Sequence, residues 1–265
     1  MGINFQRSYP LRQEYRIIKD RATEILGEYL SPDLIKFDRV EKRVTFTTER
    51  LIPTENTNRP HVMLLFSNPH PHSIQQGMFL SATTKNNENL FWPSMRDAGW
   101  FSIPEPKRNP GQLRDIFLRV KYPGPFELYF YCYYAFPTRY PDHIPKIFGK
   151  GFFSQTIEPK ANAEFKKTVQ ERAVEAIVVF NKGIFNLVSD EKIERYIEQL
   201  NKGELVQGRM RVFDKDIPIF LTHPTGWRYD KEYKRLRKAS LAKIKMRIIS
   251  ARPMTRQERK IYEEG

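Results

Sequence analysis

Four apolar runs along the chain have the length and composition of buried β-strands, and Pro, Asn or Gly residues bound them. They occupy residues 61–68, 127–136, 176–181 and 211–224. A weaker alternation of apolar and polar positions over residues 40–51 predicts a further strand or the arm of a hairpin.

Between these runs, apolar residues recur at the spacing of amphipathic helices. The predicted helices occupy residues 9–30, 89–100, 162–177, 189–203 and 230–249. Because strands alternate with helices, we predict an α/β fold: a three-layer α/β/α sandwich around a short, mostly parallel, four-stranded central sheet.

The same pattern divides the chain into three parts. We expect residues 1–58 to form an N-terminal extension, a helix plus strands, that packs on the core. Residues 59–249 form the main domain, and residues 250–265 form a basic C-terminal tail.

Composition excludes several classes of protein. In 265 residues, 40% are hydrophobic and 13% aromatic, which is too apolar for a disordered chain. No run of about 18 apolar residues predicts a membrane span, and the first residues lack the apolar core of a secretion signal. The single cysteine, Cys132, excludes a disulfide framework and a cysteine-ligated metal cluster, and we expect it to be buried and inert. We therefore expect a soluble protein that is cytoplasmic (nucleoid-associated) or nuclear.

Basic residues exceed acidic ones by 45 to 31, and the net charge of +14 suggests a polyanionic partner. Over half of this excess lies in the last 39 residues, which begin at Trp227 and carry 13 basic and 5 acidic side chains. This segment is either the solvated face of a helix or a flank that contacts phosphates.

Two of the predicted strands end in loops with an unusual polar composition. One loop contains Asn68 and the pair His70 and His72, and the other contains Thr222 and His223. Ligands of parallel sheets bind at the carboxyl ends of the strands, so these loops are the candidate site. The spacing of His70 and His72 could suit zinc, but no further ligand stands at a recognisable spacing, and we predict neither a metal nor a cofactor.

The sequence around the first loop continues with a distinctive pattern. Gly77 stands nine residues after Asn68, and Asn-Leu-Phe-Trp at 89–92 and Ala-Gly-Trp at 98–100 follow. In order and spacing, this pattern resembles the first motif of the uracil-DNA glycosylase superfamily, and it is closest to the mismatch-specific uracil and thymine glycosylases. Residues 178–185 resemble the third strand of that family with its turn, and His-Pro-Thr-Gly in 222–227 resembles its second motif. The resemblance covers about residues 60–245.

The two loops supply groups that suit cleavage of an N-glycosidic bond. An Asn amide such as that of Asn68 can orient a water beneath the sugar carbon. A neutral His can stabilise the departing base as its negative charge develops, and the resemblance implies this role for His223. The target base must leave the duplex to reach such a site. The resemblance places Trp227 at the wedge that fills the gap in the duplex, beside Arg228, and we expect Thr225 and Lys231 to contact DNA as well.

The resemblance also implies a base-binding pocket. Its candidate residues are Ser67, His70, Phe79, Leu80, Tyr131 and Asn181. Three of them depart from the family pattern: Leu80 stands where an aromatic residue is usual, Tyr131 where many branches have Asn, and His70 where the family has Gly. Asn181 is equally consistent with a turn.

These residues suggest a monofunctional DNA glycosylase that removes uracil or a related lesion base from single- or double-stranded DNA. No lysine stands at a motif position to form a Schiff base, although Lys182 is near one. We expect a monomer that does not bind membranes. Two alternatives stay open: a catalytically inactive nucleic-acid-binding protein on the same fold, and an unrelated α/β enzyme that acts on a small anionic nucleotide or sugar.

Overall fold

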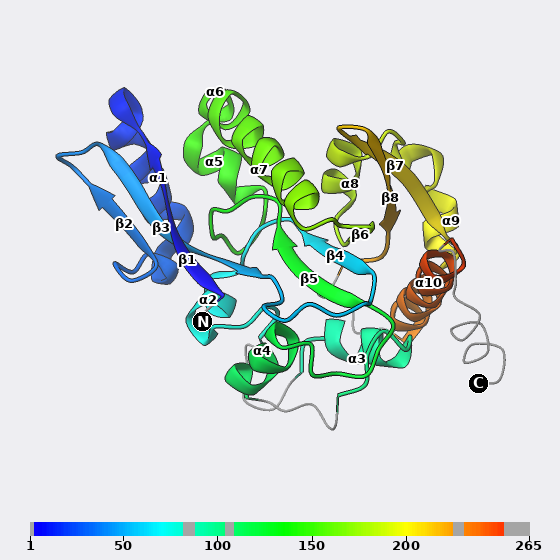
Figure 1. The fold of residues 1–265 in the computed structure, drawn as a ribbon. Coiled ribbons are helices and arrows are strands. Elements are labelled where there is room, and N and C mark those ends of the chain that lie inside the picture. Colours follow the sequence, from blue (N-terminus) through cyan, green and yellow to red (C-terminus); the bar gives the residue numbers. More distant parts are fainter. Residues whose placement is uncertain (1–2, 82–87, 104–108, 225–230, 252–265) are drawn as a thin grey trace.

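The structure is a computed structural model that describes residues 3–81, 88–103, 109–224 and 231–251. Four parallel strands form the centre of the molecule, in the order β5-β4-β6-β8 (Figure 1). They are β4 (His61–Phe66), β5 (Glu127–Cys132), β6 (Ala176–Val179) and β8 (Lys215–Leu221). Each corresponds to one of the four apolar runs, so the parallel core of the fold was correctly predicted.

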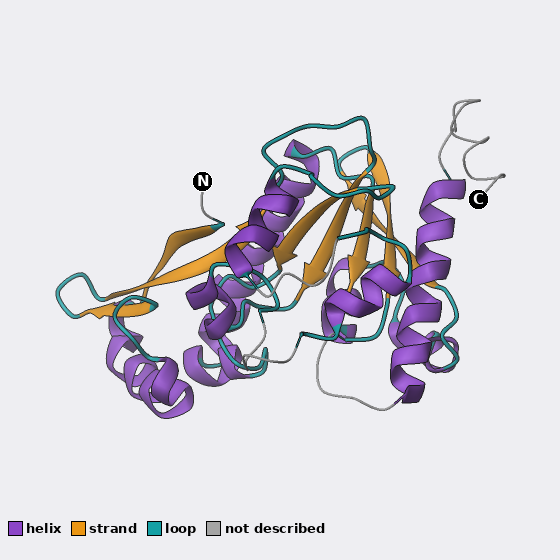
Figure 2. Cartoon of the chain, turned by 90° about the horizontal axis from the view of Figure 1, so that it is seen from below, coloured by secondary structure: helices purple, strands orange, loops and turns teal. Residues whose placement is uncertain are grey.

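The sheet is larger than predicted, because the described part of the chain contributes eight strands to it rather than four. The added strands are β1 (Asn4–Pro10), β2 (Ile35–Asp38), β3 (Arg43–Leu51) and β7 (Val206–Val212). All of their pairings are antiparallel: β3 pairs with β5, β1 and β2 both pair with β3, and β7 pairs with β8. Figure 2 shows the sheet continuing past the helices toward its N-terminal strands. The segment before residue 59 therefore extends the central sheet itself.

Helices cover both faces of the sheet (Figures 1 and 2). One face carries α5 (His143–Phe148), α7 (Glu158–Glu171) and α8 (Lys182–Val188), and α1 (Tyr15–Leu26) packs beside α5. The other face carries α3 (Phe91–Asp97), α4 (Pro110–Leu118) and α10 (Lys231–Ser250). Shorter helices are α2 (Pro71–Gln76), α6 (Lys150–Phe152) and α9 (Ile197–Asn201), with a π-helical turn at Phe153–Ile157 and 3-10 turns at Arg12–Glu14, Gly27–Tyr29 and Ile193–Arg195.

The alternation of side chains along the strands divides the buried residues into two clusters, one on each face. In β4, Met63 and Leu65 belong to the cluster under α5, α7 and α8, whereas Leu64 and Phe66 belong to the cluster over α3, α4 and α10. Both faces are apolar, which is why the parallel strands appear in the sequence as continuous apolar runs.

The basic helix α10 has an apolar stripe that packs on α3, with Leu241, Ile244 and Ile248 buried. The Trp100 Nε1 donates a hydrogen bond to the Leu241 carbonyl at 3.0 Å. Arg237 lies in the same stripe and is fully buried, so α10 is not simply a solvated basic helix. Within the described residues, no helix combines the length and apolar character needed to cross a membrane.

Candidate active-site cleft

A cleft of about 290 Å³ opens where the parallel strands end. Ser67, Asn68 and His70 follow β4 on its wall, Phe180 and Asn181 follow β6, and Pro224 follows β8. The other lining residues are Glu49, Phe66, Ser73, Phe79, Leu80, Ser81, Asn89, Cys132, Thr138, Arg139, Tyr140 and Pro141. The cleft thus lies at the carboxyl ends of the strands, the edge at which ligands of parallel sheets are expected to bind.

Several hydrogen bonds orient the Asn68 amide in the cleft. Its Nδ2 donates to the Thr138 carbonyl at 2.7 Å and to the Thr138 Oγ1 at 2.9 Å. The Thr138 hydroxyl itself donates to the Tyr140 carbonyl at 2.8 Å, so its oxygen is left as an acceptor for Asn68. Because both hydrogens of Nδ2 are bound, the Asn68 Oδ1 is the end of the amide that can receive a further hydrogen bond, and it already accepts one from the Ser67 hydroxyl at 3.0 Å.

His70 caps a helix with one ring nitrogen and can donate a hydrogen bond with the other. Its Nδ1 accepts a hydrogen bond from the His72 backbone N–H at 3.2 Å and so caps the N-terminus of α2. Burial, followed by His72 and Arg139, lowers the pKa of His70 to about 4, and the ring is neutral at pH 7. A neutral imidazole whose Nδ1 is an acceptor carries its proton on Nε2, so His70 is a neutral N–H donor on the wall of the cleft.

Aromatic side chains form the apolar wall. Phe79 is buried, with its ring 5.9 Å from Phe66 and 5.6 Å from Phe130. Gly77 ends α2 in the left-handed conformation that glycine allows, and Leu80 adopts φ +53°, which a leucine rarely does. The geometry of this turn places both Phe79 and Leu80, two of the candidate base-pocket residues, on the cleft.

Two other predicted pocket residues have different surroundings. The Asn181 Oδ1 accepts the Ile184 N–H at 3.0 Å and caps α8, so this residue is a helix cap that also borders the cleft. Tyr131 lies outside the cleft, on the opposite face of β5, with its ring 6.0 Å from Phe165. Side chains alternate along a strand, so its neighbour Cys132 faces the cleft in its place.

His223 does not line the cleft, although the next residue, Pro224, does. The ring is buried, and its Nε2 lies 2.8 Å from the Leu200 carbonyl, to which it donates. Burial is the main cause that lowers the pKa of His223, which favours the neutral ring, and the bond to Leu200 places its proton on Nε2. In this conformation His223 has no N–H to offer to a departing base, which departs from the role that the resemblance implies.

The predicted DNA-contacting residues lie at the border of the described chain. Thr225, Trp227 and Arg228 fall in residues 225–230, outside the described residues. Lys231 is the first residue of α10.

Glu49 is a cleft residue that the sequence did not indicate. It comes from β3, which joins the edge of β5, and only 3% of its surface is exposed. Burial raises the pKa of its carboxyl group well above the usual value. Cys132 is buried beside it, as expected, and burial raises the pKa of the thiol, with Glu49 as a second cause. An isolated acidic residue in a weakly alternating strand gives no sequence signal of this position.

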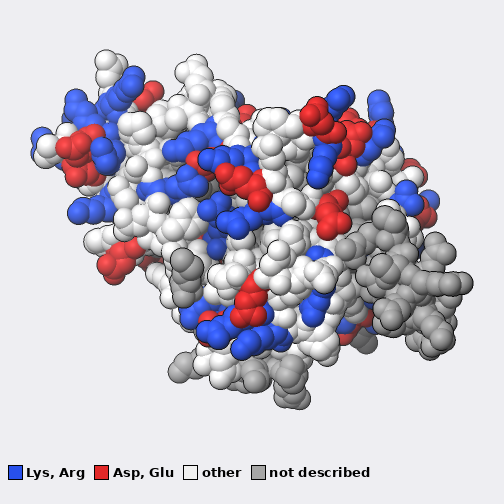
Figure 3. All heavy atoms as spheres, viewed as in Figure 1, with Lys and Arg blue, Asp and Glu red and all other residues white. Residues whose placement is uncertain are grey.

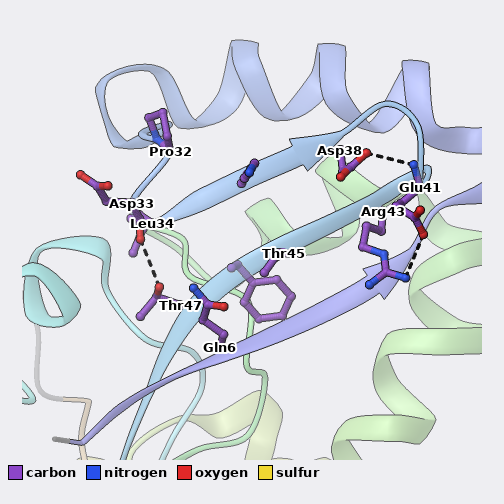
Figure 4. A pocket seen from close by; sticks show the side chains of 11 residues that line it. Gln6, Pro32, Asp33, Leu34, Asp38, Glu41, Arg43, Thr45 and Thr47 are labelled. Carbon is purple, nitrogen blue, oxygen red and sulfur yellow. Dashed lines mark hydrogen bonds and ion pairs between the residues drawn. The ribbon is translucent and has the colours of Figure 1, made fainter.

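A second hollow of about 300 Å³ lies on the N-terminal strands β1, β2 and β3 (Figure 4). Some of its polar groups make local hydrogen bonds or ion pairs. The Asp38 Oδ1 accepts the N–H groups of Val40 and Glu41 at 2.9 Å, and Arg43 pairs with Glu41 at 3.3 Å. The Asp38 carboxylate and the pair of Arg43 and Glu41 are therefore committed to local interactions.

Basic side chains gather in Figure 3 between the N-terminal strands and α7. Several of them contact aromatic rings or acids there. Arg7 pairs with Glu164, Arg50 lies 5.1 Å from the Phe5 ring centroid, and Lys160 lies 5.1 Å from that of Tyr9. Part of the positive charge on this face is thus held in local interactions.

The histidines do not assemble into a metal site. His61 begins β4 while His70 follows its other end, so the length of the strand separates them. Among the residues that the structure describes, no three His, Cys, Asp or Glu side chains are grouped so as to hold a metal ion. Comparison of the chain with models of known protein families and with curated proteins finds no match.

Proposed function

We propose that the protein is a DNA glycosylase that hydrolyses the N-glycosidic bond of uracil or a related base. The observation that carries the proposal is the Asn68 amide, fixed by Thr138 and with its oxygen available at the carboxyl end of β4. An amide oxygen that accepts a hydrogen from water directs the water's lone pair away from itself. Asn68 would orient the nucleophile in this way without deprotonating it, which suits a transition state in which the base has largely departed.

His70 is the better placed of the two histidines to assist the leaving base. Its Nε2–H donor belongs to a ring that stays neutral down to about pH 4, on the wall of the same cleft as Asn68. Such a preorganised donor stabilises negative charge on a base oxygen as the bond breaks. In this proposal, His223 supports the loop that leads to Pro224.

The cleft volume of about 290 Å³ is at the lower end of the range for small-molecule sites. It suits a single base with part of its sugar. The base would have to be flipped from the duplex, because the site is concave and lies at the ends of the strands. The three-layer arrangement around the parallel strands is that of the family which the motifs resemble.

The test is base release from oligonucleotides that contain U·G, T·G, hypoxanthine or single-stranded U, detected by alkaline cleavage of the abasic product. With enzyme in excess, we expect product from at least one substrate, and Asn68→Ala should lower the rate about 10- to 1000-fold. No product from any substrate would refute the enzymatic proposal.

One observation favours a second candidate, a nucleic-acid-binding protein of the same fold without catalytic activity. The Nε2 donor of His223 is bound to the Leu200 carbonyl, and so a group that the resemblance makes catalytic is committed elsewhere. This candidate predicts binding to every oligonucleotide without cleavage, with an affinity that falls steeply as salt is added.

A further inference from the structure

Two glutamates are deeply buried in the described part of the chain, and their hydrogen bonding differs. Glu127 accepts hydrogen bonds from the Thr57 N–H at 2.9 Å, the Thr57 hydroxyl at 3.0 Å and the Tyr129 hydroxyl at 3.1 Å. The Oε2 of Glu49, by contrast, has no hydrogen-bond partner among the described residues. A buried carboxyl oxygen without a partner is costly to the fold, so its presence calls for a ligand or a water that completes it.

Charged neighbours do not neutralise Glu49. Glu49 also borders a small cavity of about 20 Å³, together with Arg7, Arg50 and Glu164, whereas His70 and Arg139 line the cleft. Arg7 is paired with Glu164, Arg50 lies over aromatic rings, and the neighbouring Cys132 is an uncharged thiol. Burial raises the pKa of Glu49 well above its usual value, which favours the neutral acid.

A neutral carboxyl group has one O–H donor beside one C=O acceptor. This pair matches a lactam edge, in which a ring N–H stands next to a carbonyl, through two parallel hydrogen bonds. The N3–H of a pyrimidine-2,4-dione and either adjacent carbonyl form such an edge, and it stays free when N1 is bonded to the sugar. An ionised carboxylate has acceptors only and could not complete the pair.

We propose that Glu49 is the residue that recognises the base in the cleft, by pairing with the N3–H and an adjacent carbonyl of a pyrimidinedione. The choice of ligand class rests on the proposed function. The recognising residue comes from the N-terminal segment, outside the part of the chain that carries the motifs. Glu49 would thus bind the edge of the base. Many branches of the family that the motifs resemble have an Asn on the strand corresponding to β5, where this chain has Tyr131.

Binding of free bases tests this inference without requiring catalysis. 1-Methyluracil keeps the N3–H and 3-methyluracil lacks it, while both have the same size and carbonyls. Ligand-observed NMR titrations should show wild-type protein binding 1-methyluracil at least about tenfold more tightly than 3-methyluracil, because the loss of one matched hydrogen bond to a buried group has about that effect.

Two substitutions separate recognition from folding. Glu49→Gln keeps one donor and one acceptor and should bind 1-methyluracil within about threefold of the wild type, whereas Glu49→Leu should lose about tenfold or more. Wild-type affinity should decline as rising pH ionises Glu49, and Glu49→Gln should lack that component of the decline. Thermal unfolding of both variants checks that they fold.

Equal binding of the two methyluracils, or unchanged binding by a folded Glu49→Leu, would overturn the inference. Either result is expected if a water in the small cavity of about 20 Å³ completes Glu49 instead. Failure of every variant to bind either base would overturn it as well. The proposed function is judged separately, by base release. If bases are released in a way that does not depend on Glu49, the glycosylase proposal stands and the role of Glu49 does not. If Glu49 is needed for base binding but no base is released, the role of Glu49 stands and the glycosylase proposal does not.

Discussion

Two histidines near the cleft both hold their proton on Nε2, but the surroundings of that N–H differ. The His70 proton lies on Nε2 at the cleft wall, because Nδ1 accepts from the backbone, whereas the His223 proton is directed at the Leu200 carbonyl. A sequence motif contains no information on tautomer or ring orientation, since these are set by whichever backbone groups lie nearby in the fold.

If His70 assists the leaving base, its removal should affect the chemical step more than that of His223. We expect His70→Ser, whose hydroxyl can still cap α2, to lower the single-turnover rate about 10- to 1000-fold with little change in the unfolding temperature. His223→Ala should chiefly lower the unfolding temperature, because it leaves the buried Leu200 carbonyl without its donor.

His72 provides the matched control, since it lies two residues after His70 and does not line the cleft. His72→Ala should retain most of the rate. The wild-type rate should also show no titration of His70 above about pH 5, because the pKa of that ring is about 4. The reverse ranking, with His223→Ala slow and His70→Ser normal, would restore the role that the motif resemblance implies.

Glu49 should make stability depend on pH. The folded protein keeps the proton of Glu49 while the unfolded chain releases it above about pH 4.5, so the unfolded state gains stability as pH rises. Glu49→Gln removes this penalty. We expect the variant to exceed the wild type in free energy of unfolding at neutral pH, by an amount that grows about 1.4 kcal/mol per pH unit until the folded-state pKa is reached.

Urea unfolding midpoints measured from pH 4 to 8 test this expectation. The two proteins should have similar stability near pH 4, where Glu49 is largely protonated in both states. A gap that is constant with pH would indicate a packing effect of the substitution rather than ionisation.

Position along a strand explains which of the predicted pocket residues line the cleft. Asn68 follows the end of β4, so its place at the carboxyl edge follows from the strand alone. Tyr131 and Cys132 are adjacent, and only the pairing register decides which one faces the cleft, because a shift of one residue exchanges the two faces of a strand. Glu49 depends on the pairing of β3 with β5, between segments about 80 residues apart, which local sequence does not reveal.

At the scale of elements, the strands that could be predicted from the sequence are those that are buried on both faces. The four parallel strands are covered by helices on each side and appear as apolar runs. The strand β7 has one buried face and alternates with a period of two, and a turn joins it to β8, so the segment 211–224 looked like a single strand. The strand β7 and the three N-terminal strands β1, β2 and β3 therefore account for the underestimated size of the sheet.

The helix α10 divides its basic residues between the interior and the surface. Arg237 is buried, whereas Lys234, Lys238 and Lys243 are exposed. If this helix binds phosphates, replacing these three lysines with Gln should flatten the plot of log affinity for duplex DNA against log salt. The slope should decrease in magnitude by about 0.9 for each phosphate that the variant no longer neutralises.

A matched triple variant makes the measurement specific to α10. Lys19, Lys36 and Lys42 are also exposed and lie in the N-terminal segment. Replacing them with Gln changes the net charge equally, and we expect a smaller change in slope. Equal slopes for the two triple variants would mean that net charge, rather than α10, determines DNA binding.

At the scale of the whole molecule, one sheet and a shared core join the N-terminal segment to the rest. Val44 and Phe46 of β3 belong to the same buried cluster as Phe165 of α7 and Ile219 of β8. The extension thus supplies part of the core as well as Glu49 at the cleft. A boundary at residue 58 is a boundary of motif resemblance, and the packing crosses it.

Because the cluster crosses that boundary, we expect the full chain to unfold in one cooperative transition, with equal calorimetric and van't Hoff enthalpies. Phe46→Ala in the N-terminal segment and Phe165→Ala in α7 should each lower the stability of the entire molecule by about 3–5 kcal/mol, the usual effect of removing a buried aromatic side chain. Val40→Ala, at a side chain that is 88% exposed, is the control and should leave the transition unchanged.

If Phe46→Ala instead splits the calorimetric profile in two and moves only one part, the N-terminal segment is a separate folding unit. Glu49 would then reach the cleft by docking of that unit, and base binding should be lost in the lower of the two transitions.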